Sequence, residues 1–319
     1  MQAFGGIVQY EEDGEQYRFV IERRPFSITH WVNNEFAWTI NEKDTLFIAD
    51  TAKLASDEAE PVALGFRLNT EHVFGLPERA ANLLLNTTEA SDPYYMFNTD
   101  RFPHFYQTNV SLYGSLPYLT AHSLRDSGKT MDASVMWMNS APTWVDLLPI
   151  KDEKSILGTF NSMGGAIEFF SFASAVSPAR VQQLVSEISG YAPMPPLHSL
   201  GFHFSKYEYF TALSLAERSQ NFTKFGFPVD VFWMDIEHTQ EHMYFVFNYL
   251  NFTAEKLAVL NQEMDSSDRF LVAITDPHLM ADQKYKVFSQ GVALEQESTP
   301  DNHINIFIRD ENGEEPWTG

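Results

Sequence analysis

The stretch VDVFWMDIEH, residues 229–238, decides how the second half of this 319-residue chain folds. It begins as an almost unbroken apolar run, which is typical of a strand buried on both faces of a parallel sheet. It ends in polar residues, because Asp235, Glu237 and His238 follow the run. In a strand, Asp235 and Glu237 would point to the same side. Such groups could bind sugar hydroxyls or a metal, or move protons, and the alternative is a strand that simply runs out into a polar loop.

Similar apolar runs recur along the second half of the chain: LHSLGFHF at 197–204, RFLVAITD at 269–276 and HINIFIRD at 303–310. Amphipathic segments lie between them, and one of these follows Thr253, which can cap a helix. This alternation predicts a βαβαβαβ unit with a parallel sheet. Several strands end in an acid, at the edge where α/β folds place their ligands: Asp235, Asp276 and Asp310. Four strands do not close a barrel, so the unit is either a small open sheet or a truncated eight-stranded barrel.

Residues 1–176 show a different pattern, in which short alternating apolar and polar runs are separated by turn residues. This pattern predicts antiparallel β structure. A helix is predicted next, because Ser177 can cap it, Pro178 suits its first position and Gly190 can end it. The proline-rich segment YAPMPPL at 191–197 cannot continue that helix. We therefore predict three parts: a β domain at 1–176, a helical and proline-rich connector at 177–197, and a second domain at 198–319.

The composition excludes several classes of protein. Lys and Arg number 21 against 43 Asp and Glu, and a formal net charge of −22 argues against binding to nucleic acid or anionic lipid. No stretch reaches the ~18 consecutive apolar residues that a membrane-spanning helix needs. The beginning of the chain lacks the basic and apolar regions of a signal peptide, which predicts a cytoplasmic protein if the chain is complete. The absence of Cys excludes disulfides and thiol nucleophiles.

Cofactor and metal motifs are also missing from the sequence. No G-x-S-x-G, P-loop or G-x-G-x-x-G run occurs, so serine hydrolase, nucleotide hydrolase and dinucleotide-binding functions lose their usual support. His238, His242 and His278 do not form a convincing set of metal ligands. We therefore predict neither a cofactor nor a metal.

A series of longer motifs covers roughly residues 66–319. The motifs are, in order, HVFGLPERAANLLLNTTEASDPYYMFNTDRF (72–102), SLYGSLPYLTAH (111–122), APTWVDL (141–147), PPLHSLGFHFSKYEY (195–209), FPVDVFWMDIEH (227–238) and LVAITDPHL (271–279). With these motifs in this order, the chain resembles glycoside hydrolase family 31. The resemblance implies a galactose-mutarotase-like β-sandwich, followed by the first four strands of a truncated (β/α)₈ TIM barrel.

The resemblance also implies a sugar-binding site. Asp235 matches the family's strand-two aspartate, which binds hydroxyls of the terminal glucose, and hydrogen bonds to an ionised carboxylate are strong. Asp100 matches an acid on a loop that the N-terminal domain lends to the pocket, with Phe102 as a neighbouring aromatic residue. The other matches supply aromatic or apolar lining: Tyr207, Ile236, Ile274 and Trp317.

The activity that the resemblance implies is that of an α-glucosidase, which removes terminal α-linked glucose from oligosaccharides with retention, by analogy in N-glycan trimming. The family's nucleophile and acid/base motifs, of the types WxDMNE and TGD, do not occur here. We therefore assign no catalytic residue and expect the chain alone to be inactive. By analogy the protein would work in the endoplasmic reticulum lumen, with a non-catalytic β subunit as a possible partner. The alternatives are a non-catalytic carbohydrate-binding module or a partner-binding fragment.

Overall fold

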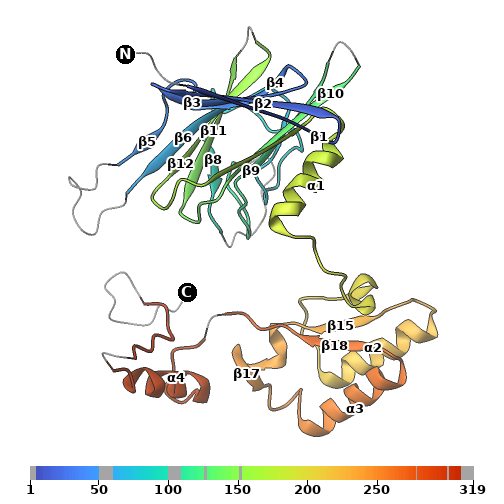
Figure 1. Cartoon of the computed structure of the whole chain (residues 1–319). Helices are drawn as coiled ribbons and strands as arrows, with labels where there is room; N and C mark the ends of the chain where they lie inside the picture. Colours follow the sequence, from blue (N-terminus) through green and yellow to red (C-terminus); the bar gives the residue numbers. More distant parts are fainter. Residues whose placement is uncertain are drawn as a thin grey trace. The chain divides into compact units, whose positions relative to one another are not determined.

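The structure is a computed structural model that forms two compact units, Met1–Tyr191 and Ala192–Gly319 (Figure 1). Each unit has a hydrophobic core of its own. The residues that the structure describes are 5–49, 60–99, 109–125, 128–150, 153–277, 279–299 and 302–309.

The N-terminal unit contains two antiparallel sheets. Within the described residues the larger sheet has nine strands, in the order β1-β2-β3-β4-β6-β12-β11-β8, with β5 paired to β6. Its strands are β1 (Gly6–Glu12), β2 (Glu15–Arg23), β3 (Phe26–Val32), β4 (Glu35–Ile40), β5 (Phe47–Ile48), β6 (Val62–Leu68), β8 (Tyr94–Met96), β11 (Thr143–Ile150) and β12 (Ser155–Ser162). The smaller sheet has the order β13-β10-β9-β7, with β7 (Val73–Gly75), β9 (Tyr118–Leu124), β10 (Thr130–Trp137) and β13 (Phe169–Ser174). The predicted antiparallel β structure is confirmed.

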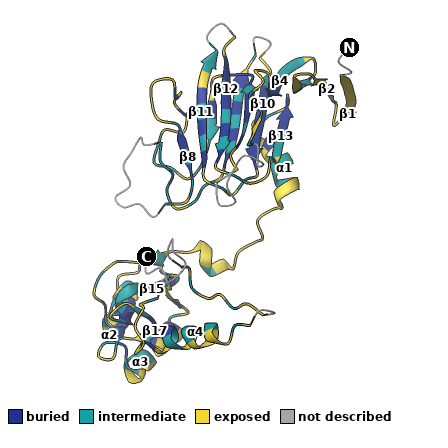
Figure 2. Cartoon of the chain, turned by 90° about the vertical axis from the view of Figure 1, so that its left-hand side faces the viewer, coloured by how far each residue is buried: buried dark blue, intermediate teal, exposed yellow. Residues whose placement is uncertain are grey.

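The core of this unit lies between the two sheets, and its buried residues are the dark blue parts of strands such as β10, β11 and β12 in Figure 2. The rings of Trp137, from the smaller sheet, and Phe160, from the larger one, stack with 5.7 Å between their centroids. Gly158 lies opposite Phe66 in the β12–β6 register. A Cβ atom on Gly158 would lie 2.2 Å from the Phe66 ring, so glycine is what leaves room for that ring.

Helix α1 (Pro178–Ser189) follows β13 and packs against β13 and β10. It begins as the sequence predicts, because the Ser177 hydroxyl accepts a hydrogen bond from the Arg180 amide at 3.3 Å. Val181 is fully buried under the helix, whereas Ile188, near its end, is 59% exposed. The helix is therefore confirmed, but Val181 is its one buried residue, and Figure 2 shows much of its outer side in yellow.

The C-terminal unit is built on a parallel sheet of β14 (His203–Phe204), β15 (Val231–Met234) and β18 (Phe270–Ala273). Helices α2 (Ala212–Lys224) and α3 (Ala254–Ser266) provide apolar side chains that pack with Phe232 and Met234 of the sheet. Thr253 caps α3 as predicted. The Ser219 hydroxyl of α2 donates to Glu263 of α3 at 2.8 Å, so the two helices are also joined by a hydrogen bond.

Short elements connect this α/β framework. They are two 3₁₀ helices, η2 (Leu197–Leu200) and η3 (Ile236–His238), a hairpin of β16 (Thr239–Gln240) and β17 (Met243–Phe247), and helix α4 (Lys286–Gln296). The hairpin was not predicted from the sequence. In the described part of the chain, no helix has the length and apolar content that crossing a membrane requires.

Two predicted strands differ in the structure. The run 197–204 begins as helix η2, because the Ser199 hydroxyl donates back to the Pro196 carbonyl at 2.7 Å, and only its last two residues form β14. The run 303–310 forms no strand in its described residues, 303–309. The amides of Ile306 and Phe307 donate instead to the Glu295 carboxylate, at 2.8 and 3.0 Å. The described barrel portion therefore has three strands where four were predicted.

Candidate functional site

The carboxyl ends of β15 and β18 lie at one edge of the parallel sheet. Met234 and Ala273, the last residues of the two strands, are opposite each other in the register. The Ile274 amide then donates to the Met234 carbonyl at 3.2 Å. Asp235 and Ile274 follow these strand ends directly, and Tyr207 lies in the segment that follows β14. The structure therefore brings three of the predicted site residues, from three neighbouring strands, to the same edge.

Asp235 begins the 3₁₀ helix η3, so the strand does not continue through it as predicted. One oxygen of its carboxylate accepts a hydrogen bond from the Ile236 amide at 2.8 Å. Its carbonyl accepts from the amide and from Nδ1 of the buried His238, at 3.0 and 2.6 Å. The prediction that Glu237 points the same way as Asp235 assumed an extended strand at these residues, and the structure has a 3₁₀ helix there instead. Three hydrogen bonds thus hold Asp235 in place, and the described residues make none to its second carboxylate oxygen.

A second carboxylate, that of Asp276, lies just beyond the end of β18. Its Oδ2 accepts a hydrogen bond from the hydroxyl of Tyr244, which the β16–β17 hairpin brings back toward the sheet. Tyr244 is 1% exposed, and its carbonyl accepts a hydrogen bond from the hydroxyl of Tyr285. Burial raises the pKa of Tyr244 above its usual value, and its hydrogen bond to Asp276, the charge of Asp276 and that of Asp235 raise it further. Two carboxylates therefore lie near one neutral phenol.

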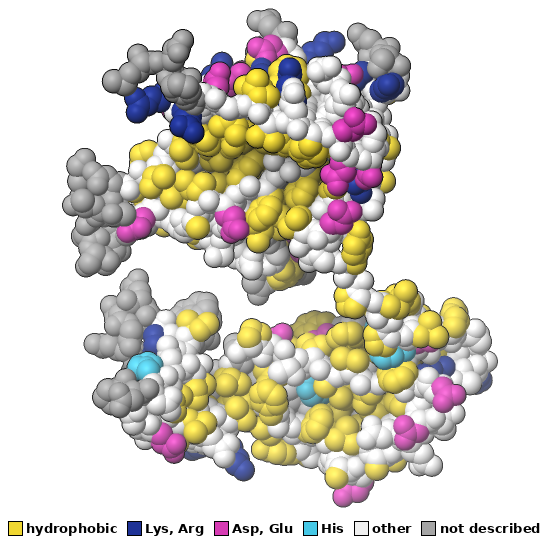
Figure 3. Space-filling view, in the orientation of Figure 1, with side chains coloured by type: hydrophobic (Ala, Val, Ile, Leu, Met, Phe, Trp, Pro, Cys, Tyr) yellow, Lys and Arg dark blue, Asp and Glu magenta, His cyan; other side chains and the backbone are white. Residues whose placement is uncertain are grey.

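Aromatic side chains are exposed in the C-terminal unit. Tyr207 is 70% exposed and Tyr209 is 86% exposed, so either ring could stack on the flat face of a ligand. Between them, Glu208 pairs with Lys206 at 2.5 Å. Figure 3 shows hydrophobic side chains, in yellow, gathered on the visible face of this unit.

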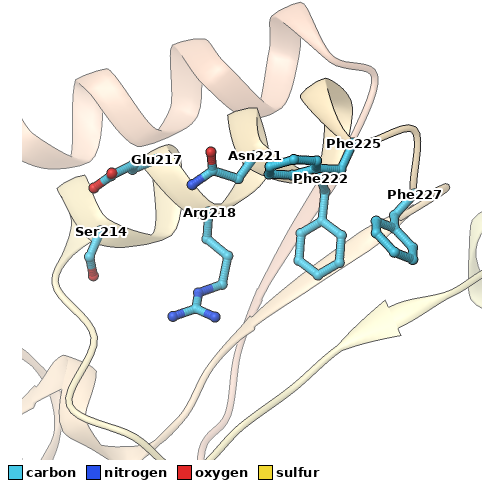
Figure 4. A pocket seen from close by; sticks show the side chains of 7 residues that line it. All are labelled: Ser214, Glu217, Arg218, Asn221, Phe222, Phe225 and Phe227. Atoms are coloured by element: carbon cyan, nitrogen blue, oxygen red, sulfur yellow. The ribbon is translucent and has the colours of Figure 1, made fainter.

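Two hollows of the C-terminal unit differ in their position on the sheet. A cavity of about 270 Å³ lies at the carboxyl edge and is lined by His238, by residues 245–247 of the hairpin and by Thr275. Another hollow, of about 400 Å³, runs along α2 and reaches Phe227, on the turn that precedes β15 (Figure 4). Because a helix leads back to the start of the next parallel strand, the end of the α2 hollow near Phe227 lies toward the amino edge of the sheet. None of the predicted site residues lines the α2 hollow.

The other predicted site residues are placed as follows. Ile236 is partly buried in η3, next to Asp235. Asp100, Phe102 and Trp317 lie outside the described residues. Sugar binding by any of these side chains stays a prediction.

Among the described residues there is no group of three or more His, Asp or Glu side chains that could hold a metal ion. His278 lies outside the described residues.

Sequence reasoning noticed Asp276 as an acid at the end of a predicted strand but did not assign it to the sugar-binding site. It missed Tyr244 and Tyr285 altogether. The hairpin that places Tyr244 turns at Glu241 and His242, whose φ angles are 53° and 62°. Gly, Asn or Asp normally occupies such turns. Because Glu and His stand here instead, the sequence did not predict this hairpin.

An antiparallel β-sandwich is followed in this chain by a parallel α/β unit with acids at its carboxyl edge, and comparison with known proteins identifies the family. Residues 3–146 match the glycosyl hydrolase 31 N-terminal galactose mutarotase-like domain. Residues 192–318 match the glycosyl hydrolases family 31 TIM-barrel domain. The chain belongs to glycoside hydrolase family 31, as its motifs predicted. Its fold is the galactose-mutarotase-like domain followed by the start of the family's TIM barrel.

The relatives of the chain are α-glucosidases of this family. It is 32% identical over 274 residues to neutral alpha-glucosidase AB of Mus musculus, which covers 80% of this chain and 27% of the mouse protein. It is 29% identical over 245 residues to glucosidase 2 subunit alpha of Schizosaccharomyces pombe, over 73% of this chain and 26% of the yeast protein. The crystal structure of the glucosidase II alpha subunit in its Glc1Man2-bound form matches with a TM-score of 0.79 and 26% identity, over 94% of this chain and 37% of that one. The chain thus spans between 26% and 37% of the length of these relatives.

Proposed function

We propose that this chain carries the glucose-recognition half of an α-glucosidase site. The observation that carries the proposal is Asp235, whose carboxylate is fixed at the carboxyl edge of the sheet by its own helix-capping bond. An ionised carboxylate with a free oxygen is a strong, directional acceptor for sugar hydroxyls. Ile274 and Tyr207, at the same edge, supply the apolar and aromatic surface on which a pyranose ring packs. The relatives' names support glucose as the sugar.

In the complete enzyme we infer hydrolysis of terminal α-linked glucose with retention, by analogy during N-glycan trimming. That reaction needs a carboxylate nucleophile and a carboxylic acid roughly 5 Å apart. The family's motifs for these two groups do not occur in the 319 residues. This chain therefore contributes substrate binding, and the bond-breaking residues come from elsewhere in the complete enzyme.

The location and the partner follow from the same relatives. A matching structure is that of an endoplasmic reticulum glucosidase II heterodimer, made of a catalytic subunit and the binding domain of a regulatory subunit. By analogy we infer that the complete protein works in the endoplasmic reticulum lumen with a non-catalytic β subunit. Co-purification of the complete protein with such a subunit would support this part of the proposal, and a cytosolic, uncomplexed protein would contradict it.

The proposed function is tested by titrating the chain with methyl α-glucoside and measuring binding by NMR. Asp235→Asn removes the charge but keeps a good helix-capping side chain, and we expect it to weaken binding by about tenfold to a hundredfold. Glu241→Gln, in the exposed hairpin turn, is the matched control and should bind like the unchanged chain. No binding by the unchanged chain, or equal binding by Asp235→Asn, would overturn the proposal.

Catalysis is tested separately with an aryl α-glucoside. We expect no release of the aryl group by the purified chain, because the two catalytic motifs do not occur in its sequence. Turnover that Asp235→Asn abolishes would show that the chain holds its own catalytic pair. It would contradict the proposal that this chain binds the substrate while the catalytic residues lie elsewhere in the complete enzyme.

A further inference from the structure

Asp276 lies just beyond the end of β18, the strand that pairs with the one Asp235 follows. Asp235 comes directly after β15, and Asp276 follows β18 by two further residues, Ile274 and Thr275. Asp276 is partly exposed, and Tyr244 supplies the hydrogen bond that the described residues give its carboxylate. One oxygen of Asp276 is therefore bonded from within the protein, and the described residues make no hydrogen bond to the other.

Tyr244 is suited to hold this carboxylate in one orientation. It is almost completely buried, and the hydroxyl of the equally buried Tyr285 donates to its carbonyl, so both its backbone and its ring are fixed. Because burial and the two nearby carboxylates keep its phenol protonated, Tyr244 always presents a donor to Asp276. A buried donor that serves a partly exposed acid is typical of a binding residue with a supporting neighbour.

We propose that Asp276 is a second hydroxyl-binding carboxylate of the same sugar site, that it accepts a different hydroxyl from the one bound by Asp235, and that Tyr244 is its positioning residue. This inference rests on the proposed function. Two carboxylates on adjacent strands would recognise two hydroxyls of one pyranose. A sugar that lacks one of these hydroxyls would leave a carboxylate without its partner, which is how a polar site rejects a close analogue.

The inference is tested with methyl α-glucoside and its 2-, 3-, 4- and 6-deoxy analogues. We expect the unchanged chain to bind at least two of the deoxy sugars about tenfold or more weakly than the parent sugar. Asp276→Asn should lose the discrimination against one of them and keep the discrimination against another, whereas Asp235→Asn should show the reverse. Asp265→Asn, exposed on α3, is the matched control and should keep both.

The role of Tyr244 is tested with Tyr244→Phe, which keeps the ring and removes the hydroxyl. We expect it to lose the same hydroxyl discrimination as Asp276→Asn, and we expect the double variant to bind like Asp276→Asn alone, because Tyr244 acts through Asp276. A purely structural role would instead weaken binding of all five sugars equally. That result would overturn the positioning role.

The outcomes separate this inference from the proposed function. If the unchanged chain binds no glucoside, the proposed function fails. If Asp235→Asn weakens binding while Asp276→Asn and Tyr244→Phe keep every discrimination, only the present inference fails. Asp276→Asn could disturb folding, so the inference is also tested without any substitution, by titrating the unchanged chain. Methyl α-glucoside should shift the NMR signals of residues 274–276 as strongly as that of Asp235, and unshifted signals there would also contradict the inference.

Discussion

The carboxylate of Glu15 accepts a hydrogen bond of 2.9 Å from the hydroxyl of Ser174, a residue 159 positions away in the sequence. The same carboxylate accepts the hydroxyl of Tyr17 at 2.9 Å, and Glu15 itself is 2% exposed. Burial raises the pKa of Tyr17 above its usual value, and the hydrogen bond to Glu15 raises it further, so the phenol stays a donor. The first strands of the larger sheet are thereby tied to the end of the smaller one.

Replacing this buried acid should destabilise the N-terminal unit. We expect Glu15→Ala to lower the free energy of unfolding by about 2–4 kcal/mol, because it leaves the hydroxyls of Tyr17 and Ser174 buried without their acceptor. Urea unfolding measures the change. Glu12→Ala, on the exposed strand β1, should change the stability by less than about 0.5 kcal/mol and serves as the control. Equal effects of the two substitutions would show that the buried bonds contribute nothing.

The stability of the N-terminal unit should depend on pH through the buried side chain of His30. Its ring is 3% exposed and stacks on Phe19 with 4.1 Å between centroids, and burial lowers the pKa of His30 to about 3. The unfolded chain binds a proton at this residue near pH 6.5, but the folded chain does not. Stability is therefore complete above about pH 6.5 and decreases as the pH falls toward 3, by up to about 1.4 kcal/mol per pH unit.

This prediction is checked by urea unfolding at pH 7 and pH 5. His30→Phe keeps an aromatic ring against Phe19 and removes the titrating group. The variant should lose less stability than the unchanged chain between the two pH values. Identical losses would mean that other groups produce the pH dependence.

The close contact between Gly158 and Phe66 predicts a severe effect of a single methyl group. Gly158→Ala should destabilise the sandwich by about 2 kcal/mol or more, because the new Cβ atom overpacks a filled core. Gly6→Ala is the matched control, since a Cβ atom on Gly6 meets nothing within 4 Å. Thermal unfolding of both variants distinguishes overpacking from a general preference for glycine in strands.

Arg269 should be the polar residue on which the C-terminal unit depends most. Its guanidinium donates to the Ser219 carbonyl and hydroxyl at 2.7 and 2.6 Å and to the Val229 carbonyl at 3.2 Å. We expect Arg269→Ala to destabilise this unit by about 2–4 kcal/mol. Arg269→Lys should recover only part of the loss, because an ammonium lacks the planar fork of donors. Hydrogen exchange of α2 and α3 amides measures the effect, and full recovery by lysine would contradict the geometric argument.

Elements with local signals were predictable from the sequence. Helices α1 and α3 begin where Ser177 and Thr253 cap them, because a capping side chain bonds to an amide only a few residues away. The strand 231–234 was predicted, but its end was not. Asp235 uses its side chain to start a 3₁₀ turn. Such a local bond ends the strand but leaves no mark in the pattern of apolar residues from which the strand was predicted.

Features that depend on distant contacts were not predictable. The run 303–309 has a strand-like composition, but its amides are taken by Glu295, a side chain of α4 whose position no periodicity reveals. In the site, Asp235 was found through its motif, whereas the Tyr244–Asp276 bond joins residues that only the β16–β17 hairpin brings together. Sequence reasoning predicted a site at the carboxyl edge of the sheet, but the pairing of side chains at that edge could be seen only in the fold.

The two units also differ in how far along the chain their partners lie. In the C-terminal unit Trp233 bonds His203 from 30 residues away, and Arg269 bonds Val229 from 40 residues away. In the N-terminal unit, by contrast, Glu15 bonds Ser174, which lies 159 residues later in the chain. Because distant partners slow folding, the C-terminal unit should fold faster than the sandwich. During synthesis, strand β2 stays without its final anchor until β13 has left the ribosome.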